Sequence, residues 1–321
     1  MMSLSTDHLI HPHAAQPSAL PLSVPLSLNL ASSLALAVTQ RTAFQSNMES
    51  GNDYKDDKHY VYAVGTIQAY FPNLSIEKEF YQACLLSGVD VSLLDSVNDD
   101  VSLAQLNSNA ALNGLLYKGL GKQENSYVAR EMNWTFSNID NNEIYTLVPI
   151  SDEKLIQFVA ALGRADPQMI MVGQWMDDGR ILVSNLIPAK ATQLTQMVES
   201  EKKNEPAFSE LVDEILSLST NDGFQPSERG LNYLLYNNTQ IYTESYSLCY
   251  NVNQNGPNPS GYQLVNVEPF TYWSGKRLIS KTVFHYQGIN TGARQSWYSA
   301  VDVTGEYPFL LTKWKRFLPQ H

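Results

Sequence analysis

The sequence has few of the residues from which catalytic and metal centres are usually built. Of its six histidines, three lie within the first 13 residues and one is the C-terminal residue, which leaves His59 and His285. The two cysteines, Cys84 and Cys249, form no CxxC pair of the kind used for zinc or redox work. Because free cysteine is among the most buried residue types, we predict that both are reduced core thiols of a cytoplasmic protein.

Short motifs of the common enzyme classes are also absent. The sequence contains no GxSxG elbow, P-loop, GxGxxG, HExxH or EF-hand loop. A catalytic triad or a histidine-based metal site would have to use His59 or His285, and the sequence identifies no partners for either. His285 lies in an alternating segment, where a residue on the face of a hairpin is the simpler interpretation. The sequence therefore predicts no catalytic residue, no metal site and no cofactor.

Positive charge is scarce and nowhere gathered into a run. The formal net charge is −11, and residues 1–58 contribute −2 of it through five acidic and three basic residues. An acidic chain without a Lys/Arg cluster lacks the electrostatic features of a nucleic-acid binder. It also lacks the polybasic patch that attracts anionic lipid. We therefore expect partners other than nucleic acid or membranes.

The first 58 residues lack the periodicity of a folded element. Ala19 to Val38 carries no charge, which resembles a signal peptide or a membrane span. However, no Lys or Arg precedes this window, and Pro21 and Pro25 interrupt its first half. We predict a disordered or low-complexity leader over residues 1–58 and one compact domain over residues 59–321.

Helix and strand patterns alternate from Tyr60 onward. Tyr60 to Tyr70 is predicted to be a strand, followed by a helix with Ser75 as its N-cap. Two hairpins are predicted, Tyr127–Asn138 with Glu143–Ile150, and Gln168–Met176 with Arg180–Ile187. Further helices are predicted over Val101–Leu120, Asp152–Leu162 (capped by Ser151 and ended by Gly163), from Pro206, and over Ser227–Asn237.

The C-terminal part is predicted to consist of strands. These are expected near Tyr262–Tyr272, Leu278–Gln287 and Gln295–Val303, paired within the main sheet. Trp297, Val301 and Val303 should share one face, because side chains alternate along a strand. The fold class predicted is α+β, with a mixed, mostly antiparallel sheet and packed helices.

A few charged residues stand within apolar segments. Arg130, Arg229 and Asp302 are of this kind, and a buried charge needs a partner. A structural ion pair is the first interpretation, and recognition of a peptide carboxylate by either arginine is the second. Trp134 offers apolar area for such a contact, as do Trp175 and Trp273. We treat Arg130, Arg229, Trp134 and Asp302 as candidate peptide or ion-pair contacts.

Four blocks in order give the chain a resemblance to a known family. They are YVYAVGTIQAYFPNLSIEKEFYQAC (60–84), ENSYVAREMNWTFSNIDNNEIYTLVP (124–149), RGLNY (229–233) and VDVTGEYPFLLTK (301–313). Together they resemble the C-terminal domain of the cyanobactin-maturation proteins of the PatA/PatG type. The segment from Gly173 to Ser219 matches this family least.

The resemblance implies a pathway without implying a reaction. In that family the domain follows a subtilisin-like protease that cleaves or macrocyclises precursor peptides. Residues 1–58 are too few for such a protease, and its Asp, His and Ser blocks are absent. The resemblance therefore favours a non-catalytic accessory domain that binds precursor peptide or maturation enzymes. Two alternatives stay open, namely an uncharacterised peptide-modifying enzyme and a homodimerisation module.

Overall fold

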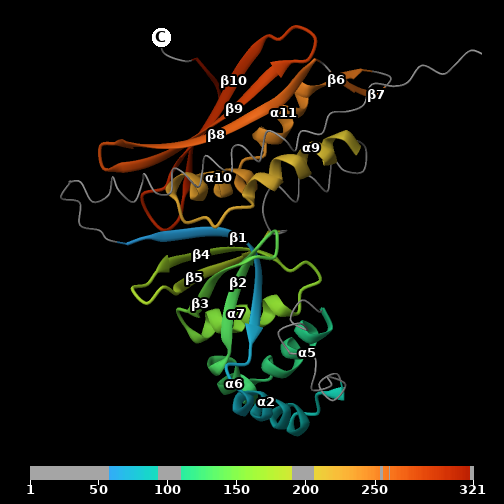
Figure 1. The fold of residues 1–321 in the computed structure, drawn as a ribbon, viewed down its shortest axis with the longest axis vertical. Coiled ribbons are helices and arrows are strands. Elements are labelled where there is room, and N and C mark those ends of the chain that lie inside the picture. The colour runs from blue at the N-terminus through green and yellow to red at the C-terminus, as the bar shows by residue number, and fades with distance from the viewer. Residues whose placement is uncertain (1–57, 93–109, 190–205, 254–255, 260, 319–321) are drawn as a thin grey trace, which may run out of the picture.

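The computed structural model describes residues 58–92, 110–189, 206–253, 256–259 and 261–318. In this part of the chain, strands form two main sheets and the helices pack on them, so the protein is α+β as predicted (Figure 1). No helix among these residues is long and apolar enough to cross a membrane. The predicted leader, apart from Lys58, and residues 101–109 of a predicted helix lie outside the described residues.

The first sheet is a closed five-stranded barrel with the order β1-β2-β3-β5-β4. Neighbouring strands are antiparallel except β3 and β5, which run parallel. Its strands are β1 (Tyr60–Tyr70), β2 (Asn133–Asn138), β3 (Glu143–Pro149), β4 (Gln168–Trp175) and β5 (Ile181–Pro188). The β4–β5 hairpin turns at Asp178-Gly179 as predicted, and Gly179 has a φ of +84° that a glycine adopts without strain.

The second sheet is antiparallel with the order β11-β10-β9-β8. Its strands are β8 (Tyr262–Ser274), β9 (Arg277–Gly288), β10 (Arg294–Asp302) and β11 (Phe309–Phe317), and β6 (Tyr250–Asn253) pairs separately with β7 (Gly256–Pro259). The sequence predicted that the C-terminal strands join the main sheet, which is wrong. They form a sheet of their own, completed by β11, which the sequence analysis missed.

Helices fall into two groups. One group packs on the barrel and consists of α2 (Leu74–Leu86), α5 (Ala110–Leu120), α6 (Ser126–Glu131) and α7 (Asp152–Leu162). The other consists of α9 (Pro206–Leu216), α10 (Pro226–Asn237) and α11 (Gln240–Cys249). Figure 1 shows this second group between the barrel and the β8–β11 sheet, with α10 next to β1.

Strand β1 separates two hydrophobic cores. Its residues alternate between them: Val61 and Ala63 belong to the core inside the barrel, whereas Tyr62 and Val64 face the helices α9–α11. Strand β4 alternates in the same way through Met169, Ile170, Met171 and Val172. Because both faces of these strands are buried, their sequences are continuous apolar runs rather than alternating ones.

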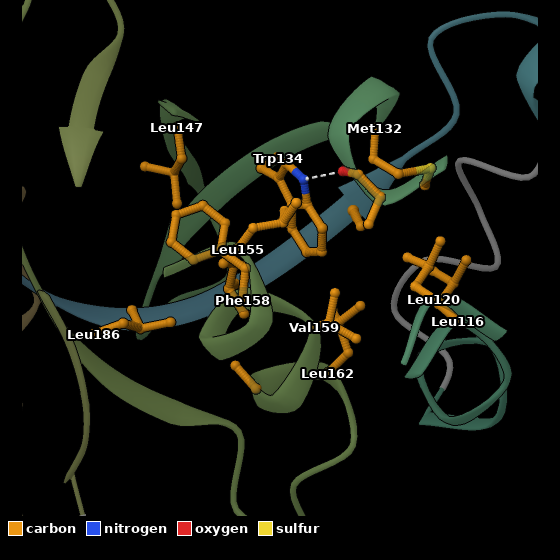
Figure 2. Close-up of a cluster of buried hydrophobic side chains, with 14 of the residues drawn as sticks. Leu116, Leu120, Met132, Trp134, Leu147, Leu155, Phe158, Val159, Leu162 and Leu186 are labelled. Carbon is orange, nitrogen blue, oxygen red and sulfur yellow. Dashed lines mark hydrogen bonds between the residues drawn. The ribbon is translucent and has the colours of Figure 1, made fainter. Parts of the chain in front are cut away.

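The barrel core is organised around Trp134. This residue is 2% exposed, and its indole Nε1 donates to the carbonyl oxygen of Ala129 at 3.0 Å. The ring centroid of Phe158, from α7, lies 5.4 Å away in an edge-on arrangement. Figure 2 shows Trp134 in the same buried cluster as leucines of β3, α5 and α7.

Two local predictions about helices need correction, and a third is confirmed. The predicted strand from Tyr127 is helix α6 up to Glu131, because Val128, Ala129 and Met132 meet the core at helical spacing. The N-cap of α2 is Asn73 rather than Ser75, since the Asn73 side chain accepts from two main-chain N–H groups. Gly163 ends α7 as predicted, although with an ordinary φ of −86°.

Candidate functional site

Arg229 holds a loop of the C-terminal sheet in place. It is 4% exposed and lies on α10. Its Nη1 donates to the carbonyl oxygen of Val303 at 3.0 Å, and its Nη2 donates to those of Gly305 and, at 3.2 Å, Glu306. Burial lowers the pKa of Arg229 to about 10, so the guanidinium stays charged at neutral pH. The partners are carbonyl groups rather than a carboxylate, and the buried guanidinium offers no free surface to a peptide.

Asp302 lies at the end of β10 and is also buried. Its Oδ1 accepts hydrogen bonds from the main-chain N and the hydroxyl of Thr304, at 3.0 and 2.7 Å. Its Oδ2 lies 3.6 Å from Nε of Arg277, whose side chain is exposed. Asp302 therefore shapes the loop after β10 and makes a partly exposed ion pair.

Arg130 does not lie in apolar surroundings as the sequence predicted. It occupies the last turn of the short helix α6, and its side chain is 49% exposed. It donates to both carboxylate oxygens of Asp152, at 3.1 and 3.0 Å, and this contact lowers the pKa of Asp152. Arg130, Arg229 and Trp134 thus occupy three separate environments and do not form one site.

The cysteines are free and buried, as predicted. Burial raises the pKa of the Cys84 thiol to about 11 and that of Cys249 to about 11. Both thiols are therefore protonated at neutral pH and poor nucleophiles. Among the described residues, no group of three or more His, Cys, Asp or Glu side chains is placed to hold a metal ion.

An exposed aromatic cluster distinguishes the outer face of the β8–β11 sheet. We call outer the face that points away from α9–α11. Strand pairing places Phe270 opposite Lys281, and Val283 opposite Tyr298, on this face. By contrast, Phe284 and Tyr286 point inward and belong to the core beneath.

Lys281 occupies the centre of this cluster. Its ammonium Nζ lies 4.9 Å from the ring centroid of Tyr298, 5.2 Å from that of Tyr272, 5.6 Å from that of Phe270 and 5.9 Å from that of Phe317. These distances are within the range of cation–π attraction. The five residues, which we call the aromatic–lysine cluster, come from all four strands of the sheet.

The cluster stays open to solvent despite its packing. Phe270 and Tyr272 are 38% and 39% exposed, and further along the outer face Phe309 and Leu311 are 46% and 40% exposed. Beneath the rings, Val283 is 1% exposed although it points away from the main core. The rings therefore shield a small apolar centre and present their own outer surfaces.

The C-terminal sheet is basic within an acidic protein. Residues 262–318 contain seven Lys/Arg and three Asp/Glu, a net charge of +4 in a chain of −11. Lys315 pairs with Tyr298 and so lies on the outer face, beside the cluster. The outer face thus combines aromatic area with positive charge.

A row of three polar residues flanks the cluster. The hydroxyl of Ser296 lies 2.8 Å from Nδ1 of His285, whose Nε2 lies 3.3 Å from a carboxylate oxygen of Glu268. The three come from β10, β9 and β8 respectively. They have the residue types of a nucleophile, base and acid, but they lie on an open sheet face. His285 and Ser296 belong to β9 and β10, which are the two central strands and pair with a neighbouring strand on each side.

Sequence reasoning missed the cluster because it missed β11, which supplies Phe317. A usable signal was present in β8, where Phe270 and Tyr272 occupy alternate positions. Alternate aromatic residues on one face of a strand indicate a continuous aromatic surface. The same alternation places Lys281 between Ile279 and Val283 on β9.

Comparisons with known proteins agree with this architecture. Residues 60–255 match the PatG domain family, and residues 198–317 match the PatG C-terminal family. A solved structure described as "PatG Domain of Unknown Function" shares the fold, with a TM-score of 0.54 and 16% identity over 81% of this chain and 98% of that chain. No curated protein matches the sequence. Because the two family matches overlap and run from β1 to β11, the chain belongs to the PatG family.

Proposed function

We propose that this protein is a non-catalytic accessory module in cyanobactin-type maturation of ribosomal peptides. It binds a precursor peptide or a maturation enzyme and does not alter it covalently. Membership of the PatG family supports the pathway. The exposed aromatic–lysine cluster carries the binding role.

The composition of the outer face supports a binding role. Aromatic residues are enriched at the centres of protein interfaces, and a few of them dominate the binding energy. Phe270, Tyr272 and Phe309 each expose apolar surface to solvent. Covering that surface with a partner would be favourable, because apolar area is removed from water. Lys281 and Lys315 add positive charge beside it.

Incubating the purified protein with a cyanobactin-type precursor peptide tests the proposal. Cyanobactin-type maturation enzymes are tested separately. Binding is read from the anisotropy of labelled precursor, and covalent change from mass spectrometry. We expect micromolar binding, which corresponds to about −8 kcal/mol, with unchanged masses. Absence of binding to precursor and enzymes alike contradicts the proposal, and more strongly if the protein forms a concentration-dependent dimer.

A peptide-modifying enzyme is the second candidate, favoured by the row Glu268–His285–Ser296. In this function Ser296 would be the nucleophile and His285 the base. A change in precursor mass made by this protein alone, and lost in Ser296→Ala, would establish it. Against it, the main-chain N–H groups of central strands are engaged in the sheet ladder, which leaves few donors for a developing oxyanion.

A further inference from the structure

We propose that the outer face of the β8–β11 sheet binds an acidic segment of a partner polypeptide that also carries aromatic side chains. Its rings pack on the aromatic–lysine cluster, and its carboxylates face Lys281 and the basic residues around it. This inference deepens the proposed function and rests on it only for the biological identity of the partner.

Aromatic rings make the cluster a preformed surface. Tyr298 and Phe317 contact each other edge-on, with centroids 6.2 Å apart, and both lie within 6 Å of the Lys281 ammonium. Mutual packing restricts the rotamers of these rings before a ligand arrives, so binding loses little further side-chain entropy. The exposed surfaces of Phe270 and Tyr272 then lie ready to cover an apolar group of the partner.

Charge selects an acidic partner. Besides Lys281, the outer face carries Lys315, and Arg277 lies over the ring of Phe309 at 6.0 Å. Two carboxylates share this face: Glu268 contacts His285, whereas Asp302 is buried, accepts from Thr304 and forms an ion pair with Arg277 at 3.6 Å. Lys281 and Lys315 are therefore the positive charges that this face offers to a partner. The net positive potential over exposed rings attracts carboxylates and repels basic segments.

Other occupants fit this face less well. Two copies meeting through the same face would bring their basic sheets together, since an isologous interface repeats one patch on both subunits. A nucleic acid carries a negative charge every few ångströms and would extend beyond the sheet. There it would meet the rest of an acidic protein, whose net charge is −11, and be repelled. A short peptide with a few carboxylates matches both the extent and the sign of the patch.

Synthetic peptides test the chemistry without reference to any natural partner. The probe is a blocked 12-residue peptide, FSESFSESFSES, in which phenylalanine and glutamate share one side of an extended chain. Its controls are FSKSFSKSFSKS, with reversed charge, and SSESSSESSSES, without rings. Fluorescein-labelled peptides are titrated with the full-length protein at low salt, and a 12-nucleotide oligothymidine serves as the nucleic-acid probe. We expect the first peptide to bind at least tenfold more tightly than either control peptide or the oligonucleotide.

Substitutions then locate the site. Lys281→Met removes the charge and keeps apolar volume, and Phe270→Ser removes an exposed ring. Each should weaken binding of the acidic peptide by about tenfold. Lys122→Met and Leu86→Ser are matched controls, because both residues are exposed on the barrel side of the molecule. These controls should bind like the unmodified protein, and circular dichroism should show that all four variants are folded.

The outcomes separate this inference from the proposed function. Equal binding of acidic and basic peptides, tighter binding of the oligonucleotide, or unchanged affinity in folded Lys281→Met and Phe270→Ser would overturn the inference. If the precursor binds and the same two variants leave its affinity unchanged, the proposed function stands and the inference fails. If the acidic peptide binds at the cluster while the precursor and the enzymes do not, the inference stands and the proposed function fails.

Discussion

The Nη1 atom of Arg229 donates a hydrogen bond of 3.0 Å to the carbonyl oxygen of Val303. This contact joins helix α10 to the loop that follows β10, across 74 residues of sequence. The same guanidinium lies 5.5 Å from the ring centroid of Tyr60 at the start of the barrel. Three of the four sequence blocks that suggested the family therefore meet at one side chain.

Replacing Arg229 with methionine should destabilise the protein strongly. The carbonyl groups of Val303, Gly305 and Glu306 would lose a charged donor, and leaving a buried acceptor without its hydrogen-bond partner costs about 1–3 kcal/mol. The matched control is Arg130→Met, whose exposed pair with Asp152 should leave the free energy of unfolding nearly unchanged. Urea unfolding measures the free energy of unfolding of both variants. Equal losses would show that Arg229 does not stabilise the loop after β10.

Gly230→Ala should separate α10 from the C-terminal sheet. A Cβ atom at this position would lie 2.3 Å from Cβ of Ser280, which is fully buried on β9. Such overpacking typically costs about 1–3 kcal/mol. Gly114→Ala, where nothing lies within 4 Å, is the control and should stabilise α5 by roughly 0.5–1 kcal/mol.

A second substitution tests whether contact with Ser280 causes the loss of stability in Gly230→Ala. Combining Gly230→Ala with Ser280→Gly removes the clashing side chain, and should recover part of the melting temperature lost in the single variant. If the double variant is as unstable as the sum of both single changes, the close approach of α10 to β9 is not the cause.

Glu214 makes stability depend on pH. Burial on α9 raises the pKa of its carboxyl group. The pKa of Glu214 is higher in the folded protein than in the unfolded chain. The contribution of this carboxyl group to the free energy of unfolding is therefore fully present below the unfolded pKa, and it is lost as pH rises through the folded pKa. Glu214→Gln should therefore raise the melting temperature at pH 8 and lose this advantage toward pH 4.

The control for this prediction is Glu210→Gln, which changes an exposed residue one turn earlier on α9. Its difference in melting temperature from the unmodified protein should vary little with pH over the same range. A Glu214→Gln variant that is less stable than the unmodified protein at pH 8 would contradict the proposed desolvation of this carboxylate.

Ending the chain after Gln287 should give insoluble protein. The truncation removes β10 and β11 and turns β9 into an exposed edge that invites aggregation. It also removes Val301 and Val303, both fully buried in the core beneath the sheet, together with Trp297 packed against it. Burial of side chains of this size contributes about 1.5–3 kcal/mol each.

A chain ending at Phe317 is the control, because it keeps all four strands of the second sheet. It should be soluble and unfold cooperatively. A soluble, cooperatively folding truncation at Gln287 would instead show that the last two strands are peripheral.

Local patterns in the sequence correctly predicted those helices and turns whose capping residues, periodicity and turn residues lie within the element itself. Helix α7 has its N-cap at Ser151, and the periodic residues of α9 are buried as expected. The hairpin about Gly179 follows from a turn pair that tolerates positive φ. In each case the capping, periodicity or turn chemistry lies within a dozen residues, so no distant partner is needed to recognise it.

Predictions that depended on distant partners were less successful. Tyr127 to Glu131 has residues suited to a strand, yet packing of Val128 and Ala129 against the barrel core makes it helical. Likewise, the exposed strand β11 has no long apolar run, and it forms because β10 pairs with it. Strand identity here is decided by the neighbour that supplies the hydrogen bonds.

The sequence by itself determined the α+β class, the order of most elements and the resemblance to the family. It could not distinguish the environments of Arg229 and Arg130, which both stand among apolar residues along the chain. Only tertiary structure buried the first beneath the loop after β10 and left the second on the surface. It also gathered the aromatic–lysine cluster from four strands spread over residues 262–317, because the register of a sheet joins residues that share no sequence period.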